Sequence, residues 1–176
     1  MTKFQNRAVR TFGIAAAFCM VSSSGKAAPL TFDCDASSGV VSSVGNLAQT
    51  APAISGIITP KRARSGQMIP SVGAQIDAPD GRSTAGFLLT LRNPDDQEMD
   101  VNMIVERGSQ KDSRKVGTVG VNSPIPFRVF VDQNGVATIF IRDQSWSAPF
   151  MRLIGGKELV FCSTGQFTVG DLRFSD

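Results

Sequence analysis

Short runs of alternating apolar and polar residues recur along residues 28–176, and glycine, proline, asparagine, aspartate or serine separates them. Such alternation puts apolar side chains on one face, which is typical of half-buried β-strands. No sustained apolar stripe at the 3.6-residue helical period follows residue 27. The pattern predicts strands at Leu30–Cys34, Ile54–Pro60, Ile69–Asp77, Thr84–Arg92, Val101–Glu106, Phe127–Asp132, Val136–Arg142, Ser147–Phe150, Glu158–Cys162 and Gln166–Phe174.

The connections between these runs carry recognisable turn signals. Asn134-Gly135 lies between two alternating runs and predicts a hairpin, because both residues accept positive φ. A second hairpin is expected to join 84–92 to 101–106 through a solvated turn that contains Pro94. Ser-Thr-Gly at 163–165 predicts a turn between the last two strands. The small-residue stretch 36–53 predicts a loop or irregular connection with at most one weak strand.

The number and length of the runs set the fold class. About ten short strands with turn signals between them predict an all-β, antiparallel β-sandwich or barrel. No internal repeat or linker divides residues 28–176, so we expect a single domain there.

Residues 1–27 have the layout of a secretory signal peptide. Lys3, Arg7 and Arg10 precede a short apolar run, and small residues lead to a cleavage site after Ala27. The apolar run is shorter than the about 20 residues that span a bilayer, although a retained N-terminal anchor is the alternative interpretation. We therefore expect export to the periplasm or the extracellular medium, with no membrane segment after the signal is removed.

Removal of the signal changes the charge of the chain. The whole sequence has 18 basic and 15 acidic residues, but four basic residues and no acidic residue fall within 1–27. The remaining domain is close to neutral, so its composition gives no reason to expect a nucleic-acid partner.

Cysteine usage predicts one disulfide. Cys19 lies within the signal, which leaves Cys34 and Cys162 as an even pair in an exported domain. The alternative is two free, buried thiols.

Three stretches together resemble the concanavalin A-like jelly-roll group, which includes laminin G-like and lectin-like domains. They are FDCD at 32–35, SPIPFRVFVDQNGVATIFI at 123–141 and the closing QFTVGDLRF at 166–174. The resemblance implies a jelly-roll sandwich with neighbouring first and last strands, which would bring Cys34 close to Cys162. The group's working motifs are missing, because no Glu-x-Asp-x-Glu run and no histidine-containing lectin metal set is present.

The chemistry available to the domain is narrow. With no histidine, Ser-His-Asp and Cys-His triads and most zinc sites are excluded. We therefore expect no catalytic residue, cofactor or metal. The acidic run Asp95–Asp100 has the hard oxygen ligands that calcium prefers, but it lacks an EF-hand pattern and fits a solvated turn better. The basic clusters 61–64 and 111–115 are interpreted as polar loops that guard strand edges.

The single tryptophan marks the one candidate ligand site. Trp146 follows Arg142 and Asp143 in a polar segment, where an aromatic ring could stack on a sugar or a peptide. Its neighbours Pro149 and Phe150 favour a place in the core instead. The candidate ligand-binding residues are therefore Trp146, Arg142 and Asp143.

The leading functional expectation is a non-enzymatic exported β-sandwich that binds a carbohydrate or another cell-envelope polymer. It rests on the resemblance of fold. The first alternative is a structural or protein-interaction module of the cell envelope, with a protein partner. The second is a glycoside hydrolase with an unrecognised carboxylate pair.

Overall fold

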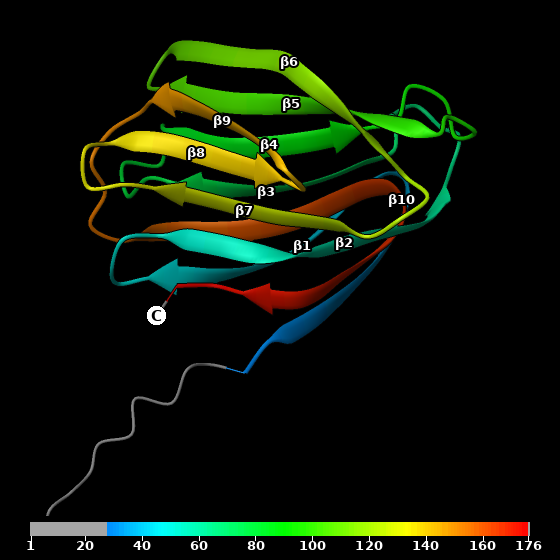
Figure 1. Ribbon diagram of the computed structural model, residues 1–176, viewed down its shortest axis with the longest axis horizontal. Helices are drawn as coiled ribbons and strands as arrows, with labels where there is room; N and C mark the ends of the chain where they lie inside the picture. Colours follow the sequence, from blue (N-terminus) through cyan, green and yellow to red (C-terminus); the bar gives the residue numbers. More distant parts are fainter. Residues whose placement is uncertain (1–27, 176) are drawn as a thin grey trace, which may run out of the picture.

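The computed structural model describes residues 28–175 of the chain as an all-β domain (Figure 1). Its strands are β1 (Leu30–Ala48), β2 (Ala53–Ala63), β3 (Ser71–Asp77), β4 (Thr84–Thr90), β5 (Glu98–Arg107), β6 (Gln110–Gly120), β7 (Ile125–Val131), β8 (Val136–Ile141), β9 (Gln144–Pro149) and β10 (Gly156–Arg173). The expected signal peptide, residues 1–27, lies outside the described residues. Within residues 28–175 no helix is long and apolar enough to cross a bilayer.

The strands form an antiparallel sheet that folds over on itself into a jelly-roll sandwich. The strand order is β6-β5-β4-β3-β10-β2-β7-β8-β9, and β1 pairs with β10 along most of its length. The first half of β10 pairs with β3, and its second half pairs with β2. The long strands β1 and β10 therefore run through both layers. One layer contains β3 to β6, and the other contains β2 and β7 to β9 (Figure 1).

The core lies between the two layers and is built from the inward-facing alternate residues of each strand. Phe87 of β4 meets Phe127 of β7 edge to face, with ring centroids 5.3 Å apart. Ile58, Ile139 and Val160 are fully buried in the same cluster. The predicted alternation is thus confirmed as the pattern that separates core from surface.

Strand β10 corrects the prediction of a turn at 163–165. The chain bends there without ending the strand, because Thr164 takes a positive φ of 52° and Gly165 follows it. A Cβ atom at Gly165 would lie 2.7 Å from the Phe167 ring, so glycine allows the close approach. The bend carries β10 from one layer into the other.

Strand β1 is longer and better ordered than the loop with at most one weak strand that was expected at 36–53. Val41–Ala48 pairs residue by residue with Ser163–Gly156 of β10. The register shifts between Ala36 and Val41, where Gly39 takes a φ of 77°. This strand is rich in small polar residues, so its sequence lacks the apolar runs from which strands were predicted. Pairing with β10 holds it in an extended conformation that its composition alone does not favour.

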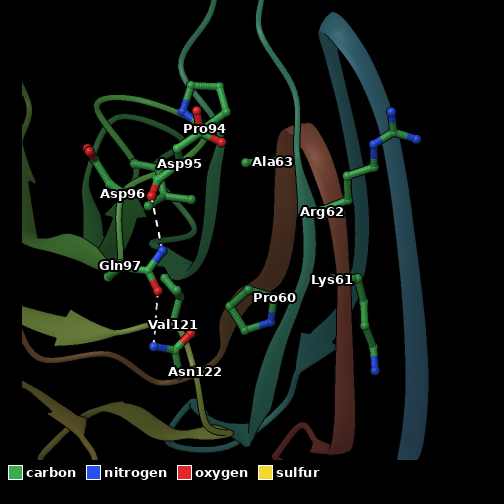
Figure 2. A pocket seen from close by; sticks show the side chains of 11 residues that line it. Pro60, Lys61, Arg62, Ala63, Pro94, Asp95, Asp96, Gln97, Val121 and Asn122 are labelled. Carbon is green, nitrogen blue, oxygen red and sulfur yellow. Dashed lines mark hydrogen bonds between the residues drawn. The ribbon is translucent and has the colours of Figure 1, made fainter.

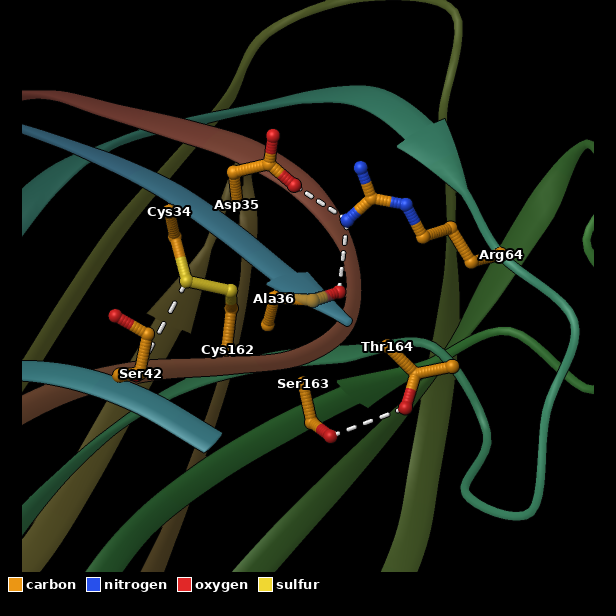
Figure 3. The surroundings of a disulfide bond; sticks show 8 residues. All are labelled: Cys34, Asp35, Ala36, Ser42, Arg64, Cys162, Ser163 and Thr164. Carbon is orange, nitrogen blue, oxygen red and sulfur yellow. Dashed lines mark hydrogen bonds and ion pairs between the residues drawn. A yellow bond between two sulfur atoms is a disulfide. The ribbon is translucent and has the colours of Figure 1, made fainter. Parts of the chain in front are cut away.

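The predicted disulfide is present, and it crosses the bend of β10 at residues 163–165 (Figure 3). Cys34 lies in the first half of β1, beside Phe167, and Cys162 lies in the first half of β10, beside Ser42. Their Cα atoms are 6.3 Å apart. Both side chains are buried, so the bond ties the two layers together inside the core. Beside it, Arg64 forms an ion pair with Asp35 and donates a 2.8 Å hydrogen bond to the Ala36 carbonyl.

The two basic clusters lie largely in strands, and only Arg64 lies beyond a strand end. Lys111 and Lys115 belong to the edge strand β6, where they pair with Glu106 and Asp100 of β5. Residues 61–63 end β2. The sequence signal for β6 was weak because residues 110–115 are all exposed and show no apolar alternation. Their charged side chains discourage edge-to-edge association at this open edge.

The hairpin predicted around Asn134-Gly135 is confirmed as β7–β8. Val131 pairs with Ala137, and only Gly135 of the two turn residues takes a positive φ, of 78°. The Asp132 carboxylate accepts 2.9 Å hydrogen bonds from the backbone amides of Asn134 and Val136. The predicted β4–β5 hairpin is also confirmed.

Candidate functional site

Trp146 lies in the edge strand β9, opposite Ile139 of β8, and is half-buried against the core. A Cβ atom added at Gly117 of β6 would lie 2.9 Å from Cζ2 of the indole. The ring therefore lies over Gly117 and closes the gap between β9 of one layer and β6 of the other. Trp146 thus packs between two edge strands, in agreement with the core placement that the sequence favoured.

Arg142 and Asp143 form the turn between β8 and β9, and Arg142 takes a φ of 55°. The Arg142 Nη2 atom donates hydrogen bonds to the carbonyls of Gly120 and Ser123, at 2.9 and 3.0 Å, and to the Ser123 hydroxyl at 2.6 Å. These bonds hold the β6–β7 connection in place. Asp143 is exposed. The structure thus does not bring the three predicted residues into one concave site, and their role in ligand binding stays a prediction.

Two phenylalanines gather on the outer face of the β7–β8 hairpin. The rings of Phe130 and Phe140 are stacked, with centroids 6.1 Å apart and an interplanar angle of 15°. The Arg128 guanidinium lies over the Phe130 ring, 4.9 Å from its centroid. Phe140 is 39% exposed. We call the surface formed by Pro126, Arg128, Phe130, Phe140 and Arg142 the arginine–aromatic face.

The arginine–aromatic face includes a shallow hollow. Pro126, Phe127, Arg128, Phe140 and Arg142 line it, and its volume is about 280 Å³. This hollow combines exposed aromatic surface with cationic groups. Next to it, Thr138 and Ser147 share a 2.8 Å hydrogen bond on the same layer. Aromatic rings beside hydroxyl and guanidinium groups form a surface that is apolar and able to donate hydrogen bonds.

A second hollow, of about 350 Å³, lies where the end of β2 meets the β4–β5 and β6–β7 connections (Figure 2). The acidic run forms its wall through Asp95 and Asp96. Its polar groups are bonded to one another: Gln97 Nε2 donates to the Asp95 carbonyl, and Asn122 Nδ2 donates to Gln97 Oε1, both at 3.1 Å. Figure 2 shows Lys61 turned away from these loops. The hollow is therefore a turn region in which these polar groups form hydrogen bonds with one another, as predicted for the acidic run.

One carboxylate of the acidic run, that of Asp100, is paired with two cations. Among residues 28–175 no group of three or more His, Cys, Asp or Glu side chains is placed to hold a metal ion. The Asp100 carboxylate accepts hydrogen bonds from Lys115 Nζ at 2.6 Å and from Arg92 Nε at 2.9 Å. The bond from Lys115, followed by that from Arg92, holds the pKa of Asp100 below its usual value.

One buried carboxylate escaped the sequence analysis. Glu158 of β10 is fully buried. Its Oε1 atom accepts hydrogen bonds from the Ala53 amide at 2.7 Å and the Ser175 hydroxyl at 2.6 Å, and its Oε2 atom accepts one from Asn46 Nδ2 at 3.2 Å. These partners come from the β1–β2 region and the C-terminal segment. The geometry assigns Glu158 to holding the chain end against the sandwich.

The two layers and the shared long strands β1 and β10 give the domain a concanavalin A-like jelly-roll fold. No protein-family model matches the chain, and no curated protein has a matching sequence.

Solved structures confirm the fold. An alginate lyase from Pseudomonas aeruginosa is 13% identical, with a TM-score of 0.52 over 72% of this chain and 65% of the lyase. This chain therefore spans just under two thirds of the lyase. The carbohydrate-binding module CBM66 from Bacillus subtilis is 8% identical, with a TM-score of 0.52 over 82% and 86% of the two chains. The carbohydrate-recognition domain of Emp46p, in metal-free form, is 10% identical, with a TM-score of 0.51 over 79% of each chain. At these identities the likeness shows the fold alone.

Proposed function

We propose that the protein is an exported, non-enzymatic β-sandwich that binds a carbohydrate on the arginine–aromatic face. The observation that carries the proposal is the stacked pair Phe130 and Phe140, held outward on two paired strands beside Arg128. The C–H groups on one face of a sugar ring pack against the negatively polarised face of an aromatic ring. The arginine and serine or threonine groups nearby supply hydrogen bonds to sugar hydroxyls.

Two further findings support this proposal. The similar solved structures include a carbohydrate-binding module and a carbohydrate-recognition domain, although an alginate lyase has the same fold. The Cys34–Cys162 disulfide fits an oxidising compartment, which agrees with an exported protein. Glu158 is buried among hydrogen-bond donors and Asp96 accepts a hydrogen bond from the Asn93 amide, so both of these carboxylates have structural partners.

The test is electrophoresis of the protein through gels that contain xylan, laminarin or polygalacturonate. At least one of these polysaccharides is expected to retard the protein, and Phe140→Ala is expected to weaken the retardation by about tenfold, because a stacked aromatic contributes about 1–1.5 kcal/mol. Phe161→Ala is the matched control, since this half-buried ring lies over Gly73 on the outer face of the other layer. Unretarded wild-type protein, or equal retardation of wild type and Phe140→Ala, would refute the proposal.

A second candidate function is association through the open edge of β1. Val41–Ala48 pairs with β10 on one side only, and Val41 and Leu47 are 56% and 70% exposed. Residues 36–48 contain no charged side chain, whereas the edge strand β6 carries several. Because charges normally protect an edge, an uncharged apolar edge favours strand addition.

The partner that fits this edge most simply is a second copy of the chain, paired antiparallel about a two-fold axis. Sedimentation velocity is expected to show a dimer that Leu47→Lys dissociates. A wild-type monomer at all concentrations tested would rule out the self-paired form.

A further inference from the structure

A row of side chains on the outer face of the second layer extends the arginine–aromatic face. Arg173 of β10 lies opposite Ser55 of β2, Ser55 lies opposite Arg128 of β7, and Arg128 lies opposite Phe140 of β8. Neighbouring strands are about 4.8 Å apart, so the backbones of Arg173 and Arg128 are separated by roughly 10 Å. Arg142 stands at the end of β8, where its backbone amide donates a 2.9 Å hydrogen bond to the Pro126 carbonyl.

The positive charges of this row are not neutralised by the protein. None of the four ion pairs in residues 28–175 includes Arg128, Arg142 or Arg173. Arg142 donates to carbonyl and hydroxyl oxygens, which satisfy its protons but leave its charge in place.

The carboxylates closest along the chain do not change this result. Asp143 and Asp171 are exposed, and neither takes part in a described ion pair. Asp132, at the end of β7, accepts hydrogen bonds from the backbone amides of its own turn. Arg128, Arg142 and Arg173 outnumber the two exposed carboxylates Asp143 and Asp171, so the face keeps a net positive charge.

We propose that the arginine–aromatic face, extended by Arg173, selects anionic polysaccharides, whose sugar rings carry carboxylate or sulfate groups. This inference rests on the proposed carbohydrate-binding function and names the class of ligand. The rings would stack on Phe140, and the guanidinium groups would bind the anionic substituents. Guanidinium matches a carboxylate or sulfate with two parallel hydrogen bonds, which a neutral sugar cannot offer.

The spacing of the charges favours a polymer over a single sugar. The row from Arg173 through Ser55 and Arg128 to Phe140 crosses four strands, so its backbone positions span roughly 14 Å, which is longer than one sugar ring. A chain laid across the strands meets these side chains in succession. The repeated charge of an acidic polysaccharide then allows several weak contacts to act together.

The experiment compares polygalacturonate, dextran sulfate and neutral laminarin as ligands of the full chain by affinity electrophoresis. Wild-type protein is expected to bind at least one anionic polymer tighter than laminarin. Arg128→Gln and Arg173→Gln are each expected to lower that affinity by roughly tenfold and to lower the affinity for laminarin by a smaller factor, because a neutral sugar offers no anion to the guanidinium group. Arg107→Gln is the matched control, because this exposed arginine of β5 lies in the other layer and has no described ion pair. Raising the salt to about 0.5 M is expected to weaken only the anionic interaction.

The outcomes distinguish a failure of the anionic-ligand preference from a failure of the proposed carbohydrate binding. If no polysaccharide retards the wild-type protein, both fail. If laminarin and the anionic polymers bind equally and the arginine variants change neither, carbohydrate binding stands and the preference for anionic ligands is wrong. Tighter binding of single-stranded oligo(dT) than of either anionic polymer would also overturn the inference, because basic groups beside aromatic rings can recognise nucleic acid as well. Preference for polygalacturonate over dextran sulfate, or the reverse, identifies carboxylate or sulfate as the anion.

Discussion

Removal of the Cys34–Cys162 disulfide is expected to take away a large part of the stability of the domain. The bond closes a loop across a sequence separation of 128 residues and joins the two layers. For a loop of this length, the chain-entropy relation gives about 5 kcal/mol of stabilisation through the unfolded state. Domains of this size are stable by about 5–15 kcal/mol in total, so the double variant Cys34→Ala/Cys162→Ala is expected to be only marginally folded.

The assay is urea unfolding followed by the fluorescence of Trp146, the only tryptophan of the chain. Its ring packs between β9 and β6, so it reports the separation of the layers. With a slope of about 2–3 kcal/mol per molar urea, the midpoint is expected to fall by roughly 2 M. Reduced wild-type protein is the matched control and is expected to unfold at the midpoint of the double variant.

Two results would refute this reasoning. One is a change in unfolding free energy below about 1 kcal/mol, because the loop-closure term would then be missing. The other is a thiol count in unreduced, denatured protein in which Cys34 and Cys162 both react. Reductant is expected to leave the double variant unchanged, which separates loss of the bond from any other effect of the reagent.

Three further predictions concern single side chains. Glu158→Gln is expected to lower the unfolding free energy by about 1–3 kcal/mol in urea titrations, because the new amide group is a donor where the carboxylate accepts a hydrogen bond from Asn46. An unchanged midpoint would show that the C-terminal segment does not depend on the Glu158 carboxylate. Gly135→Ala is expected to cost about 1–2 kcal/mol for the positive φ alone, and more than Gly81→Ala in the same assay, because its Cβ would lie 2.8 Å from the Arg152 amide nitrogen whereas Gly81 has open space. The pKa of Asp100 is lowered, first by the hydrogen bond from Lys115, so the ionised carboxylate stabilises the fold. This stabilisation is fully present above the unfolded pKa of about 3.9 and is lost as the pH falls through the folded pKa. Asp100→Asn is therefore expected to reduce the loss of stability between about pH 5 and 3, and the same pH dependence in wild type and variant would contradict this role of Asp100.

The elements that the sequence predicted well are those whose signal is local. In the β7–β8 hairpin, Asn134-Gly135 and the alternation of Val129 and Val131 on one side define the strands, the turn and the buried face. The even cysteine pair similarly predicted the Cys34–Cys162 bond without knowledge of the coordinates.

The elements that were missed owe their order to distant partners. Ser163 and Thr164 are turn formers, yet they continue β10 because both sides of that strand are paired, with β1 and with β3 or β2. Val41–Ala48 lacks an apolar run, and β10 holds it in place. Local composition cannot report pairing between residues more than 100 positions apart.

The candidate site was missed for a different reason. Trp146 attracted attention as the single tryptophan, but its ring is used in packing. The signal was available in the hairpin itself: if Phe127 and Val129 face the core, Arg128 and Phe130 must face outward. The sequence left open which residues of 136–141 face the core, so the place of Phe140 beside Arg128 could not be settled before the register was known.

The arginine–aromatic face differs from those parts of the surface where charge placement agrees with the fold. Arg64 is paired with Asp35 and Lys115 with Asp100, and the edge strand β6 is protected by charge. On β7 and β8, two phenylalanines and unneutralised arginines occupy outward-facing strand positions. Polar residues that favour strands would leave less apolar surface exposed at these positions. Folding gives no reason for this combination, because Phe140 adds little to the core and the arginines bring no ion pair. A local departure from such consistency is expected where a surface is kept for binding. The physical case for a ligand site on this face therefore stands on the residues themselves and is independent of the likeness to other jelly-roll proteins.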